Sequence, residues 1–89
     1  MIKVKFPSVF TQITKERKVE VENVGTVREL LDKLFEKYPQ LKERLIKDGE
    51  ITPFINIFVN GEDIRYLKGL DTELKDGDEV TFIPAISGG

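Results

Sequence analysis

TVRELLDKLFEK, residues 26–37, is the stretch around which the rest of this 89-residue sequence can be arranged. Thr26 followed three residues later by Glu29 is a capping box, which satisfies free N–H groups at the first turn of a helix. The apolar side chains recur at helical spacing: Val27, Leu30, Leu31, Leu34 and Phe35. We therefore predict an amphipathic helix that starts at about Val27 and ends before Pro39, because proline cannot continue the backbone hydrogen-bond ladder.

Two strands are predicted before this helix. Residues 2–6 alternate apolar and lysine side chains, a period of two that is typical of a strand with one buried face. The alternation resumes over residues 18–22. The polar residues 9–18 predict a connection, so the two strands would form an N-terminal hairpin with a long loop.

The sequence after the helix predicts further helical turns and more strands. The apolar side chains of residues 41–46 indicate one or two helical turns, closed by Asp48-Gly49. Residues 54–59 are β-rich and precede Asn60-Gly61, the strongest short hairpin signal. We expect a short polar return strand over residues 62–66 and a last strand over 80–83. In the strand over residues 54–59, alternation predicts that Ile55, Ile57 and Val59 lie on one face of the sheet. Asn56 and Phe58 would lie on the other face.

This order of elements predicts an α+β fold of the ubiquitin-like β-grasp type, with a mixed sheet of about four to five strands over one main helix. The first and last strands would pair in parallel at the centre of the sheet. Residues 1–89 are predicted to form a single domain, since a chain of this length can bury only one modest core.

The composition excludes several kinds of chemistry and partner. The sequence has no Cys and no His, so it offers no thiolate nucleophile, no imidazole base and no usual transition-metal site. The net charge is −2, and no basic patch lies near the C-terminal end, so we expect no nucleic-acid partner. No apolar run approaches the ~18 residues of a membrane span, and we expect a cytoplasmic protein.

The last ten residues differ from the rest. Residues 80–89 carry no charged side chain, although 34% of the chain is charged. Gly88 and Gly89 have no Cβ, so they can lie extended in a channel too narrow for a side chain. The expected chemistry therefore lies on the carboxyl carbon of Gly89, at the end of the chain.

Three segments together carry a resemblance to a known family. These are FINIFVNG (54–61), LKDGDEV (74–80) and IPAISGG (83–89). The chain resembles the small ubiquitin-like sulfur-carrier proteins of the MoaD and ThiS type over its whole length. Residues 59–65 and the ending 83–89 are more similar to the MoaD-related carriers that serve cysteine synthesis, the CysO type, than to ThiS.

The resemblance implies a carrier that does no catalysis itself. A ubiquitin-activating-type adenylating enzyme, using ATP and Mg²⁺, would adenylate the carboxylate of Gly89, and sulfur would then replace AMP to give a thiocarboxylate. No cofactor or metal is expected on the carrier. Gly88, preceded by Ser87, would thread through the channel of the activating enzyme. The partner would contact an apolar group of side chains: Phe58, Phe82, Ile83, Pro84 and Ile86.

Two of these expected contacts have alternatives. Alternation more often places a residue such as Phe82 in the core. Phe58 is as well explained by a second small core as by an exposed contact.

The receiving pathway is also open. Service as the small subunit of molybdopterin synthase, in molybdenum cofactor biosynthesis, is the favoured outlet. Sulfur donation to a cysteine-synthase-like enzyme, or for tRNA thiolation, is the alternative within the carrier class. Two alternatives come from other functional classes. One is a ubiquitin-like modifier joined to lysines through Gly89, and the other is a plain interaction domain.

Overall fold

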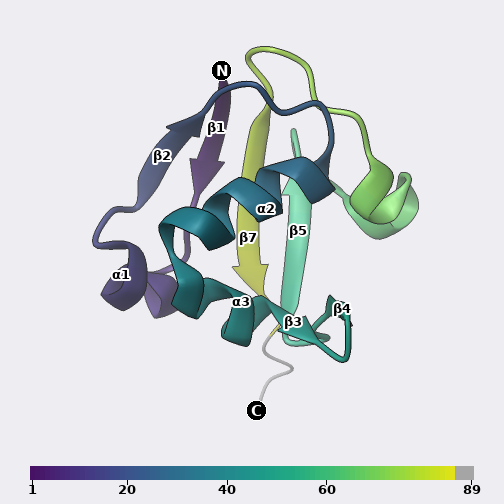
Figure 1. Ribbon diagram of the computed structural model, residues 1–89. Helices are drawn as coiled ribbons and strands as arrows, with labels where there is room; N and C mark the ends of the chain where they lie inside the picture. Colours follow the sequence, from purple (N-terminus) through teal and green to yellow (C-terminus); the bar gives the residue numbers. More distant parts are fainter. Residues whose placement is uncertain (86–89) are drawn as a thin grey trace.

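The computed structural model describes residues 1–85 and arranges them as a sheet that a long helix crosses on one face (Figure 1). In chain order the elements are β1 (Ile2–Lys5), α1 (Ser8–Thr14), β2 (Lys18–Val21), α2 (Val27–Lys37), α3 (Pro39–Leu45), β3 (Ile46–Lys47), β4 (Glu50–Ile51), β5 (Ile55–Val59), β6 (Glu62–Asp63), the 3₁₀ turns η1 (Ile64–Tyr66) and η2 (Gly69–Asp71), and β7 (Glu79–Pro84).

The main sheet has five strands in the order β2-β1-β7-β5-β6, and β3 pairs with β4 in a separate small hairpin. Strand β7 lies at the centre, parallel to β1 and antiparallel to β5. The predicted parallel pairing of the first and last strands is therefore confirmed. A mixed sheet of this topology over helix α2 is the β-grasp arrangement, which confirms the α+β fold class.

Helix α2 begins as its capping box predicts. The hydroxyl Oγ1 of Thr26 accepts a hydrogen bond from the N–H of Glu29 at 3.2 Å. In return, Oε1 of Glu29 accepts from the N–H of Gly25 at 2.6 Å. The apolar side of the helix faces the sheet, and four of its side chains are buried: Val27, Leu30, Leu31 and Leu34.

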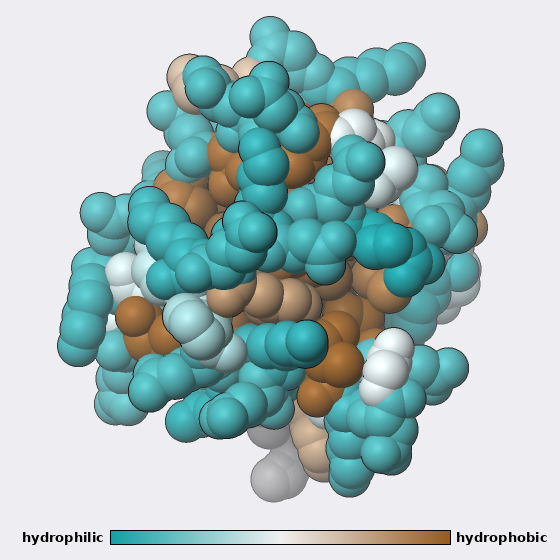
Figure 2. All heavy atoms as spheres, in the orientation of Figure 1, coloured by the Kyte–Doolittle hydropathy of each residue, from teal (hydrophilic) through white to brown (hydrophobic). Residues whose placement is uncertain are grey.

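The core forms between this helix face and the inner face of the sheet. Alternation in each strand supplies the sheet side chains, and Leu41 and Leu45 of α3 close the lower end. The outward side of α2 is hydrophilic, and Figure 2 shows hydrophilic residues over most of the face on which this helix lies. Strand β7 therefore lies at the centre of the sheet, with Val80 and Phe82 in the core.

The predicted connection over residues 9–18 is wrong in part, because residues 8–14 form helix α1. Phe10 and Thr14, four residues apart on one side of the helix, are buried. Packing of these side chains stabilises a short helix whose polar composition and missing N-terminal side-chain cap would not predict one.

The predicted return strand over residues 62–66 is also shorter than expected. Only Glu62 and Asp63 pair with β5, and the chain then turns into η1. The side chain of Asp63 accepts a hydrogen bond from the N–H of Arg65 at 2.8 Å, which starts this turn.

Candidate functional site

The candidate site is the end of strand β7, where the chain leaves the sheet. Pairing with β5 continues as far as Pro84, which lies opposite Ile55. One residue later, the N–H of Ala85 donates a hydrogen bond to the carbonyl oxygen of Phe54 at 2.8 Å. Backbone hydrogen bonds thus hold the chain up to the last described residue. The predicted tail residues Ile86, Ser87, Gly88 and Gly89 lie outside the described residues.

Phe82 is a core residue, and the expectation that it contacts a partner is wrong. Its side chain is 1% exposed. Its ring stacks on Phe6 at a centroid distance of 5.8 Å and an interplanar angle of 4°, and Phe6 packs edge-on against Tyr38. The physical reason is alternation in β7, which turns Val80 and Phe82 towards helix α2.

The neighbouring residues Ile83 and Pro84 are accessible. Ile83 points to the opposite face of the sheet from Phe82 and is 42% exposed. It lies opposite Asn56 on β5, and Pro84 is half-buried. Both residues therefore stand where a protein that binds the end of β7 can touch them.

Phe58 lies on the same outer face of the sheet as Ile83. It is half-buried and is flanked by Thr81 on one side and Asp63 on the other. Its position agrees with the predicted division of β5, since Ile57 and Val59 are buried. The ring is neither part of the main core nor fully exposed.

Sequence reasoning missed Phe54, which is 69% exposed and lies beside the point where the chain leaves the sheet. Its exposure could have been predicted, because alternation along the strand places Phe54 on the same face as Asn56 and Phe58. Ile55 and Ile57, on the other face, are buried. We call Phe54, Ile83, Pro84 and Ala85 the tail-exit patch. None of its four side chains is charged.

Asp63 and Arg65 form an ion pair near the edge of the outer face. The guanidinium and the backbone N–H of Arg65 donate to the buried carboxylate of Asp63, with the shortest contact, from Nη2, at 2.7 Å. The side-chain bond from Arg65 holds the pKa of Asp63 below its ordinary value, although burial opposes this shift. The same bond raises the pKa of Arg65. This pair gives the outer face a positioned cation.

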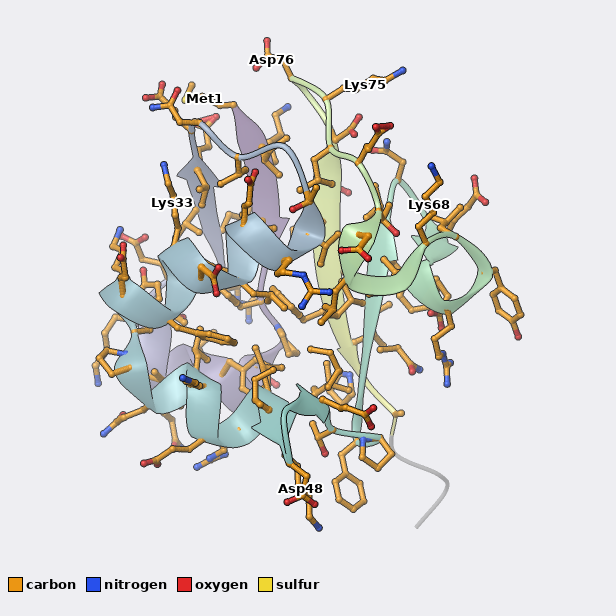
Figure 3. The ribbon with its side chains drawn as sticks, turned by 45° about the vertical axis from the view of Figure 1, so that its right-hand side comes forward. Met1, Lys33, Asp48, Lys68, Lys75 and Asp76 are labelled. Atoms are coloured by element: carbon orange, nitrogen blue, oxygen red, sulfur yellow. The ribbon has the colours of Figure 1, made fainter. Side chains whose placement is uncertain are left out.

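The acidic residues before β7 are used by a turn at the other end of the strand. The carboxylate of Asp78 accepts from the side-chain amide of Asn60 at 3.0 Å and from the N–H of Lys75 at 2.8 Å. These two bonds, the first of them the stronger influence, lower the pKa of Asp78. Asp76 forms an ion pair with the amino group of Met1. Figure 3 shows Lys75 and Asp76 at one end of the molecule and Asp48 at the end where β7 finishes.

Residues 1–85 contain neither a cluster of metal ligands nor a helix that could span a membrane. No group of three or more side chains there could hold a metal ion. Within the same residues, no helix has the length and apolar character needed to cross a membrane.

The comparisons with known proteins agree with one another. Residues 4–89 match the model of the ThiS family. A protein of Archaeoglobus fulgidus that is provisionally named a sulfur carrier is 42% identical over 88 residues, which cover 99% of this chain and 98% of that protein. Small archaeal modifier protein 3 of Haloferax volcanii is 33% identical over 90 residues, with coverage of 99% and 98%.

A solved structure is similar over the whole chain. A chain in the crystal structure of the Amycolatopsis orientalis BexX/CysO complex superposes with a TM-score of 0.91 at 38% identity, and the match covers 100% of both chains. The names of these relatives describe sulfur carriers and modifiers, and the Amycolatopsis structure is a complex with a second protein.

Proposed function

This chain belongs to the ThiS family, and on that premise we propose that its Gly89 carboxylate is adenylated by a partner enzyme and converted to a thiocarboxylate that donates sulfur. The observation that supports this most is the uncharged segment after Glu79, because residues 80–89 carry no ionisable side chain beside the proposed Gly89 carboxylate. No side chain there competes with it for an activating enzyme.

The proposed chemistry explains why activation is needed. A terminal carboxylate with a pKa near ~3.5 is anionic at neutral pH and resists attack by a nucleophile. Transfer of AMP from ATP to a carboxylate oxygen releases pyrophosphate and turns that oxygen into a leaving group. A sulfur nucleophile then attacks the carboxyl carbon and expels AMP. ATP and Mg²⁺ belong to the adenylating enzyme in this scheme, and the carrier supplies the carboxylate.

The role of the fold in this scheme is to present the end of the chain. Strand β7 is held on both sides, by β1 and by β5, and hydrogen bonds fix the chain up to Ala85. A tail that starts from a rigid position costs less conformational entropy to place in an enzyme than one that starts from a loop. The proposed threading residues Ser87, Gly88 and Gly89 follow within four residues of that point.

The enzyme that receives the sulfur is a separate question. The full-length matches carry the names sulfur carrier, CysO complex and archaeal modifier, and this favours a CysO-type outlet, sulfur transfer to a cysteine-synthase-like enzyme. Service to molybdopterin synthase and tRNA thiolation stay predictions. A stable complex with a large molybdopterin-synthase-like subunit would favour service to molybdopterin synthase. A stable complex with a cysteine-synthase-like enzyme would favour the CysO-type outlet.

A second function follows from the similarity to the Haloferax modifier. The same activated Gly89 can form an isopeptide bond if a lysine amine, in place of sulfur, attacks the carboxyl carbon. High-mass lysine conjugates in cells, lost when Gly89 is deleted, would support this use.

Pyrophosphate exchange tests the first step. The adenylating enzyme of the same organism, incubated with ATP, Mg²⁺ and labelled pyrophosphate, should form labelled ATP only when the carrier is present. Deletion of Gly89 should abolish the exchange. Asp76→Ala, a change in the exposed turn at the other end of β7, is the matched control and should leave it unchanged. Exchange that survives the deletion would contradict the proposal.

A further inference from the structure

We propose that Phe54 is the side chain that anchors the adenylating enzyme beside the tail, an inference that rests on the proposed function. It concerns a residue that lies before β5, thirty residues or so from the tail in sequence but next to it in space. The enzyme would receive the ring in an apolar pocket at the entrance to the channel that takes the tail.

The position of Phe54 is set by a backbone hydrogen bond. Its carbonyl oxygen accepts from the N–H of Ala85 at 2.8 Å, so the two residues lie directly side by side. An enzyme that takes up the chain after Ala85 has to cover the place where the chain leaves the sheet. Phe54 is 69% exposed at that place, so the enzyme covers this ring as it takes up the tail.

The neighbours of Phe54 define the chemistry of the enzyme surface. Ile83 follows the same outer face and is 42% exposed, and Pro84 and Ala85 are half-buried. None of these side chains is charged, and the sequence of residues 86–89 has no charged side chain either. An uncharged surface of this kind is complementary to an apolar pocket and not to a charged one, because a charge placed against it would lose water without gaining a partner.

The fold itself does not account for the ring. Phe54 is not part of the core cluster that the described residues form, whereas the strand that follows it contributes Ile55, Ile57 and Val59 to that cluster. A largely exposed aromatic side chain adds little to folding. The same side chain gains much when a partner removes it from water, and aromatic residues of this kind dominate binding at interfaces.

A second exposed aromatic side chain provides a matched control. Tyr66 in η1 is 84% exposed. It follows β6, which pairs with the far end of β5 at Val59 and Glu62. Tyr66 belongs to η1, and the backbone hydrogen bond that places Phe54 beside Ala85 does not involve it.

The experiment measures pyrophosphate exchange at varied carrier concentration for the wild type, Phe54→Ala, Phe54→Leu and Tyr66→Ala. For Phe54→Ala we expect the KM for the carrier to rise about ten-fold or more, with kcat within two-fold. Phe54→Leu should recover part of the loss, because it restores apolar area. Tyr66→Ala should stay within two-fold of the wild type. Melting temperatures of all four proteins, by circular dichroism, should agree.

The outcomes separate the anchor from the proposed function. If the wild type supports exchange and deletion of Gly89 abolishes it, while Phe54→Ala keeps a wild-type KM, the role of Phe54 is overturned and the carrier function stands. Equal rises in KM for Phe54→Ala and Tyr66→Ala would also overturn it. If the wild type supports no exchange with the adenylating enzyme, both the function and the anchor fall.

Discussion

Phe82→Ala is the substitution that best separates the core of this protein from its contact surface. The ring, carried by the central strand β7, is 1% exposed and stacks on Phe6, which follows β1. Removal of a buried phenylalanine ring costs about 3–5 kcal/mol, of which part comes from the cavity that remains. The lost ring pair places this site in the upper part of that range. Since small domains unfold at a total cost of about 5–15 kcal/mol, the variant should lose about a quarter or more of its stability.

Ile83→Ala is the matched comparison, one residue away on the opposite face. Its side chain is 42% exposed, so truncation removes less buried area and leaves no enclosed cavity. We expect a loss of about 1 kcal/mol or less. Urea unfolding followed by far-ultraviolet circular dichroism gives both values on the same protein background, with the m-value as a check for two-state behaviour.

Equal losses in the two variants would refute the assignment of the two faces of β7. The same conclusion would follow if Phe82→Ala left the free energy of unfolding nearly unchanged and weakened binding to the adenylating enzyme instead. In that case Phe82 would be the contact residue that the sequence first suggested.

Two further predictions concern single polar contacts. Thr26→Ala removes the hydroxyl that accepts from the N–H of Glu29, and it should lower the free energy of unfolding by about 0.5–2 kcal/mol, measured by thermal unfolding, with Glu36→Ala on the exposed side of the same helix as a surface control. Because the pKa of Asp78 is lower in the folded state, its contribution to stability is present above the ordinary carboxyl value of 3.8 and is lost as the pH falls through the lower folded value. Asp78→Asn keeps one acceptor oxygen but loses the titratable charge and the second acceptor. It should therefore be less stable than the wild type at neutral pH but lose less stability on acidification, and equal acid sensitivity in thermal unfolding at pH 2–6 would count against this reasoning.

The helix and the sheet topology were predictable because local and long-range signals agree. The capping box at Thr26 and Glu29 is formed as the sequence indicates. The Asn60-Gly61 hairpin signal is also correct, since both residues adopt a positive φ, 51° and 87°. These turn geometries depend on a few adjacent residues, so the sequence is sufficient to define them.

The elements that sequence reasoning missed depend on tertiary contacts. Helix α1 is seven residues long, and burial of Phe10 stabilises it more than its own propensity does. The two-residue strands β3 and β4 have no period to detect. Residues 64–66 were expected to continue the strand, but the side chain of Asp63, the last strand residue, accepts from the N–H of Arg65 and so caps the turn that follows.

The candidate site divides in the same way. Alternation alone separates Phe82 from Ile83, and the core position that it offered as the alternative for Phe82 is the correct one. Phe54 required knowledge that β5 starts beside the end of β7, a contact across more than thirty residues of sequence. The importance of Gly89 rests on the sequence and on family membership.

Intact mass spectrometry of the full chain tests the proposed carrier function most directly. The protein is incubated with its adenylating enzyme, ATP, Mg²⁺ and sulfide, and a protein lacking Gly89 is treated in parallel. We predict that the mass of the full chain rises by the difference between one sulfur and one oxygen atom, that fragmentation locates the change at Gly89, and that the shortened chain is unchanged. A full chain that keeps its original mass while the enzyme forms its adenylate, or a sulfur located at any other residue, would contradict the account.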